Sequence, residues 1–195
     1  MDRVDVLLGF NAEMHETLLR QGHTVAIFDD DPDLPPGVPC VGTWDQLPAW
    51  FEAQQNKGVA LRVVLGVAAT AAGRERARKW AINNLPVDFR WGRVISEKAI
   101  ISSSAILGEG ASVSDGAYVG PRVQLRDLAC VIAFGRVYHD SIIGEGSVIV
   151  GGAAVMGKSK VGRRCHICAG ATVLPYGDLA DDVTVGAGGS CRRVH

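Results

Sequence analysis

The hydrophobic positions in the second half of the chain repeat every six residues, from residue 95 to residue 185. An α-helix places apolar residues three and four apart, and a half-buried strand places them at every second residue, so neither explains a period of six. The repeated position is aliphatic sixteen times without a break: Ile95, Ile101, Leu107, Val113, Val119, Leu125, Val131, Val137, Ile143, Ile149, Val155, Val161, Ile167, Val173, Leu179 and Val185.

A second set of positions, four residues after each aliphatic one, is nearly all small. Its members are Ala99, Ala105, Ala111, Ala117, Val123, Ala129, Gly135, Ser141, Ser147, Ala153, Ser159, Cys165, Ala171, Gly177, Val183 and Gly189. Branched residues that fill an interior, and small residues where the chain turns, are typical of a parallel β-helix with one hexapeptide per face. Three faces make one coil, so residues eighteen apart stack, and sixteen hexapeptides make a little over five coils.

The first ninety residues have a different pattern, in which short apolar runs alternate with helical segments. Strands are predicted at 4–8, 24–28, 61–65 and 87–91, helices at 12–20, 44–55 and 71–84, and a proline-rich loop at 32–39. This order predicts a Rossmann-like parallel sheet. The expected fold class is therefore an α/β N-terminal domain over 1–92, followed by a β-helix domain over 93–195.

Glycines and aspartates stand where the predicted strands of the N-terminal domain end, at Gly9, Asp29, Asp30 and Gly66. Ligands of open parallel sheets bind at that edge, so these residues are candidates for substrate binding. The dinucleotide fingerprint G-x-G-x-x-G is absent, because residues 10–13 after Gly9 are Phe-Asn-Ala-Glu. The alternative is that the glycines only end strands and the aspartates only cap a loop.

Charge and composition narrow the function classes. With 20 basic and 21 acidic residues the net charge is −1, which argues against a nucleic-acid partner. The chain shows no apolar run long enough to span a membrane and no signal-peptide pattern, so a cytoplasmic protein is expected. Cys165 and Cys168 form a C-x-x-C, but no second pair completes a zinc site, so packing is preferred over redox or metal chemistry and no metal is expected.

His139 is the main candidate for chemistry in the repeat domain. It lies two residues after the inward Val137, on the outer surface, and is followed by Asp140. A neutral imidazole held by a carboxylate is what a general base near pH 7 requires, although an ordinary exposed histidine fits the same position. Gly157 lies eighteen residues further on and stacks over His139, where its N–H could stabilise an oxyanion.

Several motifs together resemble a known family. They are His139-Asp140-x-x-Ile143-Gly144, Val161-Gly162-Arg163-Arg164, Leu174-Pro175 and Leu179-Ala180-Asp181-Asp182. The chain resembles the PglD/NeuD-like bacterial sugar acetyltransferases, which are hexapeptide-repeat acyltransferases, over its whole length and most clearly after residue 137. The resemblance implies a left-handed β-helix, whereas general rules favour right-handed crossovers.

The resemblance also implies roles for the site residues. It makes His139 the general base, Asp140 the residue that orients it, and the Gly157 N–H the donor to the thioester oxygen. Acetyl-CoA would be the co-substrate, and the acceptor amine would attack it directly, without an acyl-enzyme.

Coenzyme and acceptor contacts are implied in the same way. Ala169 and Ala187 match positions that line a coenzyme A groove between subunits of a homotrimer, together with Gly157. Val148 stands where the family carries a second histidine near the coenzyme. The N-terminal domain would bind the UDP of a nucleotide-linked 4-amino-sugar, near the four candidates at the strand ends.

Two other functions remain open from the sequence, and a third is disfavoured. O-acetylation of a sugar such as sialic acid would use the same base on a hydroxyl. A non-catalytic trimeric scaffold or sugar-nucleotide sensor is the second alternative. A γ-type carbonic anhydrase needs three zinc-binding histidines, and His166 lies one and a half coils from His139, which counts against it.

Overall fold

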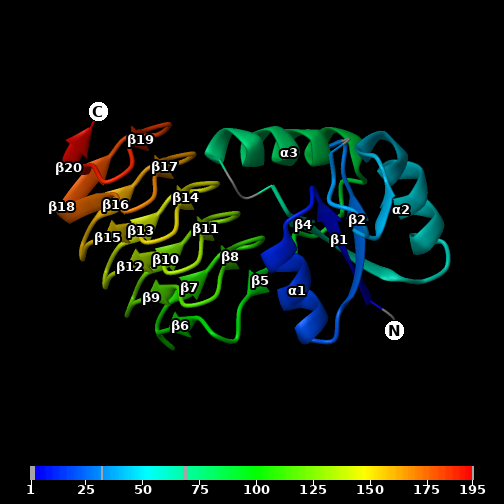
Figure 1. The fold of residues 1–195 in the computed structure, drawn as a ribbon, viewed down its shortest axis with the longest axis horizontal. Helices are drawn as coiled ribbons and strands as arrows, with labels where there is room; N and C mark the ends of the chain where they lie inside the picture. Colours follow the sequence, from blue (N-terminus) through cyan, green and yellow to red (C-terminus); the bar gives the residue numbers. More distant parts are fainter. Residues whose placement is uncertain (1–2, 32, 68–69, 195) are drawn as a thin grey trace. The chain divides into compact units, whose positions relative to one another are not determined.

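The computed structural model describes residues 3–31, 33–67 and 70–194. The chain forms two compact units (Figure 1). The first comprises Met1–Val67 and Arg76–Gly92, and the second comprises Ala68–Glu75 and Arg93–His195.

A four-stranded parallel sheet forms the first unit, in the order β3-β2-β1-β4. The strands are β1 (Arg3–Leu8), β2 (Thr24–Phe28), β3 (Cys40–Gly42) and β4 (Ala60–Leu65). The second halves of β1, β2 and β4 are buried aliphatic or aromatic runs, as expected of strands covered on both faces. These apolar runs form the core of the unit.

The helices of the chain are α1 (Ala12–Arg20), α2 (Leu47–Gln55) and α3 (Ala71–Asn84), with a short 3-10 turn, η1 (Trp44–Gln46), before α2. Helix α1 begins at the predicted residue because the Asn11 side chain accepts a hydrogen bond from the Met14 N–H at 2.9 Å. Among the described residues, no helix is long and apolar enough to cross a membrane.

One sequence prediction for this unit was wrong, and one strand was not predicted. Residues 87–91 form no strand: Pro86 starts a turn that the Phe89 N–H closes on the Pro86 carbonyl at 3.0 Å, and Trp91 alone of these residues bridges to Val63. Strand β3 was not predicted, because three residues after a proline-rich loop show no periodicity. The predicted loop at 32–39 includes residue 32, which lies outside the described residues.

The second unit consists of parallel two-residue strands that stack in three columns (Figure 1). They are β5 (Val94–Ile95), β6 (Ile100–Ile101), β7 (Ile106–Leu107), β8 (Ser112–Val113), β9 (Tyr118–Val119), β10 (Gln124–Leu125), β11 (Cys130–Val131), β12 (Arg136–Val137), β13 (Ile142–Ile143), β14 (Val148–Ile149), β15 (Ala154–Val155), β16 (Lys160–Val161), β17 (His166–Ile167) and β19 (Thr184–Val185). Two longer strands, β18 (Thr172–Leu179) and β20 (Ser190–Val194), complete the stack. Paired residues lie eighteen apart from β5 to β19, as with Val137 and Val155, so the predicted parallel β-helix is confirmed.

The interior of the coils is a single apolar column. Some of its small residues also carry hydroxyl groups that hydrogen-bond to the next coil. Most of the aliphatic and small positions of the hexapeptides are completely buried. Ser141, Ser147 and Ser159 tolerate burial because each hydroxyl donates to a carbonyl of the next coil, at 3.0, 2.7 and 3.1 Å. Most turns also place a residue with positive φ three positions after the aliphatic one, often glycine but also Asp140 and Lys158.

Replacing Gly66 with alanine is expected to destabilise the protein by about 3 kcal/mol or more, because overpacking against backbone cannot relax. A Cβ at Gly66 would lie 1.8 Å from the Gly9 carbonyl oxygen. The shift of the urea unfolding midpoint measures the effect. Gly186→Ala is the control, because a Cβ there meets nothing within 4 Å. Equal midpoints for the two variants would contradict the close approach of Gly66 and Gly9.

Candidate active site

One corner of the β-helix carries the predicted catalytic residues. It is formed by the stacked turns that follow β9, β12 and β15 and by the middle of β18. The corresponding residues in these turns are Pro121, His139, Gly157 and Pro175, each eighteen after the last. Hydrogen bonds tie adjacent turns together: Asp140 N–H donates to the Pro121 carbonyl at 2.9 Å, and Lys158 N–H to the His139 carbonyl at 2.9 Å. The corner is therefore a rigid support for side chains.

His139 and Asp140 form an imidazole–carboxylate pair. The His139 Nδ1 lies 2.8 Å from Asp140 Oδ2, with 52% of the histidine side chain exposed. The Arg122 guanidinium, with a smaller contribution from His139, holds the pKa of the Asp140 carboxyl well below its usual range. Because an ionised carboxylate only accepts hydrogen bonds, Nδ1 must carry the proton of the neutral ring. This tautomer leaves the lone pair on Nε2, where a general base needs it.

Arg122 is the third member of this arrangement, and sequence reasoning missed it. Its Nε donates to Asp140 Oδ1 at 2.6 Å and its Nη2 to Oδ2 at 2.9 Å. The signal was available, because Arg122 lies eighteen residues before Asp140, just as Gly157 lies eighteen after His139. Bidentate arginine–carboxylate pairs fix the plane of the carboxylate, which makes Arg122 relevant to the orientation of the imidazole.

Gly157 lies directly against the His139 ring. A Cβ at Gly157 would be 2.6 Å from Nε2 and 2.7 Å from Cε1, so only glycine leaves room for the imidazole in this position. Among the described residues, no acceptor is found for the Gly157 N–H. The stacking inferred from the eighteen-residue register is therefore present in the structure, and it places an unbonded backbone donor beside the candidate base.

A cavity of about 230 Å³ opens beside His139. Its walls are Tyr138, His139, Met156, Gly157, Lys158, Pro175 and Tyr176. The Lys158 Nζ lies 5.6 Å from the centre of the Tyr176 ring, a cation–π contact that places a positive charge at the cavity. The cavity thus combines a candidate base, an N–H donor without an acceptor among the described residues, apolar surface and the Lys158 cation, a set of groups that could serve acyl transfer to an uncharged nucleophile.

The predicted substrate-binding residues meet in the first unit, at the carboxyl end of its sheet. The Gly9 N–H donates to the Phe28 carbonyl at 2.8 Å, and Gly66 packs against the Gly9 carbonyl. Asp29 accepts hydrogen bonds from the N–H groups of Phe10 and Asp31. The structure brings Gly9, Asp29 and Gly66 together, and each has a local structural function there.

Asp30 is also used locally, because its Oδ1 accepts from the Trp44 N–H at 2.7 Å and so begins η1. Its side chain stabilises the loop after β2, as in the structural alternative raised by the sequence. One carboxylate oxygen of Asp30 and the exposed position of the residue remain compatible with ligand binding.

The predicted coenzyme residues other than Gly157 lie away from His139 within the chain. Ala169 and Ala187 are exposed and stack on the corner after β17 and β19, where the Gly188 N–H donates to the Ala169 carbonyl at 2.9 Å. Val148 is 0% exposed and therefore presents no surface to a ligand in this chain. It lies between Cys130 and His166 on one outer face, and His166 Nδ1 accepts from the Ala71 N–H at 3.4 Å.

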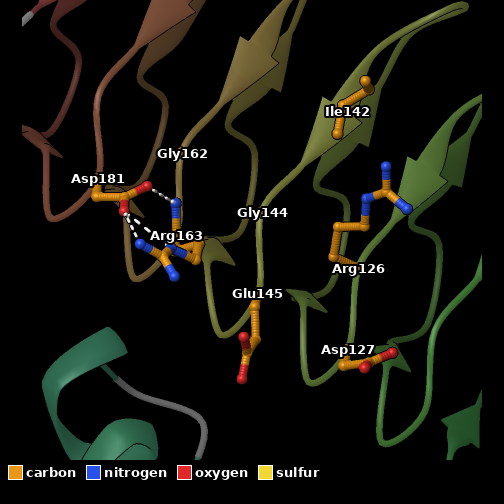
Figure 2. A pocket seen from close by; sticks show the side chains of 8 residues that line it. All are labelled: Arg126, Asp127, Ile142, Gly144, Glu145, Gly162, Arg163 and Asp181. Carbon is orange, nitrogen blue, oxygen red and sulfur yellow. Dashed lines mark hydrogen bonds and ion pairs between the residues drawn. The ribbon is translucent and has the colours of Figure 1, made fainter.

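A larger cavity of about 420 Å³ lies on the third corner (Figure 2). It is lined by Arg126, Asp127, Ile142, Gly144, Glu145, Gly162, Arg163 and Asp181. Figure 2 shows Arg163 directed at Asp181, and the two side chains pair at 2.7 Å. This cavity contains no histidine, cysteine or hydroxyl group, so the smaller cavity at His139 is the better candidate for catalysis despite its size.

Neither of the two cavities is lined by a cysteine. Within residues 3–31, 33–67 and 70–194, no group of three or more His, Cys, Asp or Glu side chains could hold a metal ion. Cys165 is buried, and burial raises the pKa of its thiol, while Cys168 is partly exposed. Both cysteines are free thiols.

The chain was compared with protein-family models, curated protein sequences and solved structures. No protein-family model and no curated protein sequence matches the chain. Among solved structures, PerB from Caulobacter crescentus, in complex with CoA and GDP-perosamine, matches with a TM-score of 0.78 and 28% identity, over 97% of this chain and 88% of PerB. Variants of that perosamine N-acetyltransferase with one histidine replaced by asparagine or alanine, in complex with the same two ligands, match with a TM-score of 0.67.

The acetyltransferase domain of PglB from Neisseria gonorrhoeae also shares the fold. It matches with a TM-score of 0.84 and 23% identity, over 97% of this chain and 91% of that domain. The parallel coils and the covering helical part fit the left-handed β-helix of these acetyltransferases. The resemblance to hexapeptide-repeat sugar acetyltransferases that the sequence predicted is therefore confirmed.

Proposed function

We propose that this chain, a relative of the hexapeptide-repeat sugar acetyltransferases, is an acetyl-CoA-dependent N-acetyltransferase that acts on a nucleotide-linked amino-sugar. The observation that carries the proposal is the His139–Asp140 pair, whose imidazole lies against Gly157, a residue whose N–H has no acceptor among the described residues. The likeness to PerB, which was solved with CoA and a nucleotide-linked amino-sugar, supports the class of both substrates.

His139 takes the proton in this mechanism. The acceptor enters the cavity as a neutral amine, and its nitrogen attacks the carbonyl carbon of the acetyl thioester. Nε2 removes an N–H proton as the new C–N bond forms, while Asp140 stabilises the resulting imidazolium through Nδ1–H. The C–S bond then breaks, and the imidazolium returns the proton to the sulfur of the leaving CoA.

The Gly157 N–H stabilises the negative charge that develops on the carbonyl oxygen. A backbone donor held by the coil needs no reorganisation at the moment of reaction, which makes such donors effective. The peptide that carries this N–H is held through its own carbonyl, because the Met156 oxygen accepts a hydrogen bond from Ser141 Oγ at 3.0 Å. Base and oxyanion donor thus sit on two neighbouring coils of one rigid support.

The acceptor's nucleotide is assigned to the first unit, which we interpret as a Rossmann-like domain. Gly9, Asp29 and Gly66 converge at the edge where open parallel sheets bind ligands. UDP was the sequence prediction, and it stays a prediction, because PerB was solved with a GDP-sugar. The 4-amino position of the sugar likewise stays a sequence prediction.

Acetyl-CoA is assigned to a groove between subunits. Ala169 and Ala187 lie on a different corner from His139, so one chain alone does not combine all the predicted coenzyme contacts. A second copy that brings its Ala169 corner to His139 would complete the site. The predicted homotrimer should have a mass of about 62 kDa, three times 20.6 kDa, by light scattering, and a monomer in solution would contradict the shared groove.

Release of the CoA thiol tests the proposed function directly. The purified chain is mixed with acetyl-CoA and, separately, a UDP-linked 4-amino-sugar, a GDP-linked 4-amino-sugar and sialic acid. We expect thiol release only with an amino-sugar and an N-acetylated product by mass spectrometry. Release with sialic acid alone would support O-acetylation instead, and no release with any acceptor would support the scaffold or sensor alternative.

A further inference from the structure

The Asp140 carboxylate is held from the coil below by a side chain that the mechanism above does not use. Arg122 meets both oxygens of Asp140, at 2.6 and 2.9 Å, and Asp140 Oδ2 also meets His139 Nδ1 at 2.8 Å. One oxygen is therefore shared between the guanidinium and the imidazole. The order from coil to coil is Arg122, then Asp140 with His139, then Gly157.

We propose that Arg122 is a positioning residue of the catalytic base, which acts through Asp140 to fix the plane and tautomer of the His139 ring. This inference rests on the proposed function for its kinetic consequences. Its structural consequence, the tautomer of the ring, can be observed without turnover.

Keeping Asp140 ionised is not the main effect of Arg122. An aspartate with an ordinary pKa of about 3.9 is already ionised near pH 7, so lowering that pKa further changes little at neutral pH. The orientation of the carboxylate does change, because an unclamped aspartate rotates about two side-chain bonds and can turn Oδ2 away from Nδ1. The two parallel hydrogen bonds of an arginine fork remove this freedom.

Apart from His139 and Arg122, no side chain at this site holds the Asp140 carboxylate among the described residues. The other groups that face the pair are Lys158 on the coil above, Tyr138 beside the ring, and Tyr176 at the cavity wall, and none of them contacts Asp140 in the described residues.

The Arg122–Asp140 pair is one bidentate arginine–aspartate clamp, and the chain contains a second clamp of this kind that has no histidine beside it. Arg164 donates to Asp182 through Nε at 2.7 Å and Nη2 at 2.6 Å, again across eighteen residues. The φ angles also match, with 56° and 61° for Arg122 and Asp140, and 54° and 62° for Arg164 and Asp182. The second clamp therefore shows what the pair does for coil stability alone.

The test compares Arg122→Gln, Arg122→Lys and Arg164→Gln with the unmodified protein. Arg122→Gln is expected to lower kcat by roughly ten- to a hundredfold, because a small misplacement of a catalytic group has effects of this size. The KM values for both substrates should stay within about twofold.

The other variants separate charge from orientation. Arg122→Lys keeps the charge but not the fork, so kcat should fall in this variant too, because the orientation of the carboxylate is lost. Arg164→Gln should change thermal stability as much as Arg122→Gln and leave kcat unaltered. In an Asp140→Asn background, Arg122→Gln should have no further effect on kcat, because the carboxylate through which it acts is gone.

Two results would overturn the inference. Equal kinetics for Arg122→Gln and Arg164→Gln would show that the Arg122–Asp140 pair only stabilises the coils. A change confined to KM would show that Arg122 contacts a substrate. Nitrogen-15 NMR of the histidine rings gives an answer independent of the acceptor. It should show the Nδ1–H tautomer of His139 in the unmodified protein and a mixture in Arg122→Gln. An unchanged tautomer refutes the positioning, whereas absent turnover of the unmodified protein refutes only the proposed function.

Discussion

Replacing His139 with alanine is expected to lower kcat on the order of a hundredfold or more, while acetyl-CoA still binds with nearly its original affinity. General-base catalysis contributes a factor of this size, and the coil that carries His139 does not depend on its side chain, which is half exposed. The measurement is the initial rate of CoA release, together with calorimetric titration of acetyl-CoA.

Glu97→Ala is the matched control for His139→Ala. Glu97 is exposed and occupies the same turn position on a different corner of the β-helix, so its replacement should leave turnover unaltered. Unchanged turnover of His139→Ala would remove the base from the proposed mechanism, and a loss of folding in that variant would show that the histidine supports the coil.

Gly157→Ala is expected to reduce kcat by about a hundredfold with little loss of stability. The added methyl carbon would lie 2.6 Å from His139 Nε2, so the exposed ring must rotate out of its position. A displacement of about 1 Å in a catalytic group has an effect of this size. The variant keeps the backbone N–H, so the loss reports the position of the base and not the loss of the oxyanion donor.

Gly186→Ala again serves as the control, because a Cβ at that position meets no atom within 4 Å and the φ angle is ordinary. The two alanine variants should unfold at similar temperatures and differ only in turnover. Full activity of Gly157→Ala would show that the contact between Gly157 and the imidazole has no catalytic importance.

The register of the repeat domain could be predicted from the sequence because every coil obeys the same constraint. An inward aliphatic residue at each sixth position leaves one possible stacking, and Val137 pairs with Val155 as that stacking requires. The same arithmetic placed Gly157 beside His139, and applied downward it also places Arg122 beneath Asp140. The candidate site was therefore largely readable from spacing.

Other parts depended on contacts that no local pattern contains. Val148 follows the strand pattern and was expected near the coenzyme, but it is completely buried beside His166, which meets the distant Ala71. The aspartates after β2 were candidates for substrate binding or for loop caps, and the structure adds that Asp29 and Asp30 accept from the N–H groups of Phe10 and Trp44. These contacts join residues that are far apart in the sequence, so they depend on how the chain packs and not on the local sequence pattern.

The sequence by itself determined the coils, their spacing and the residues that share a corner, because a strict hexapeptide period allows only one register. The tertiary structure alone decided which side chains meet within that register. The Arg122 fork reaches both oxygens of Asp140 only because two turns with positive φ are held one above the other. Spacing places residues on neighbouring coils, but rotamers and hydrogen bonds decide whether they act on one another.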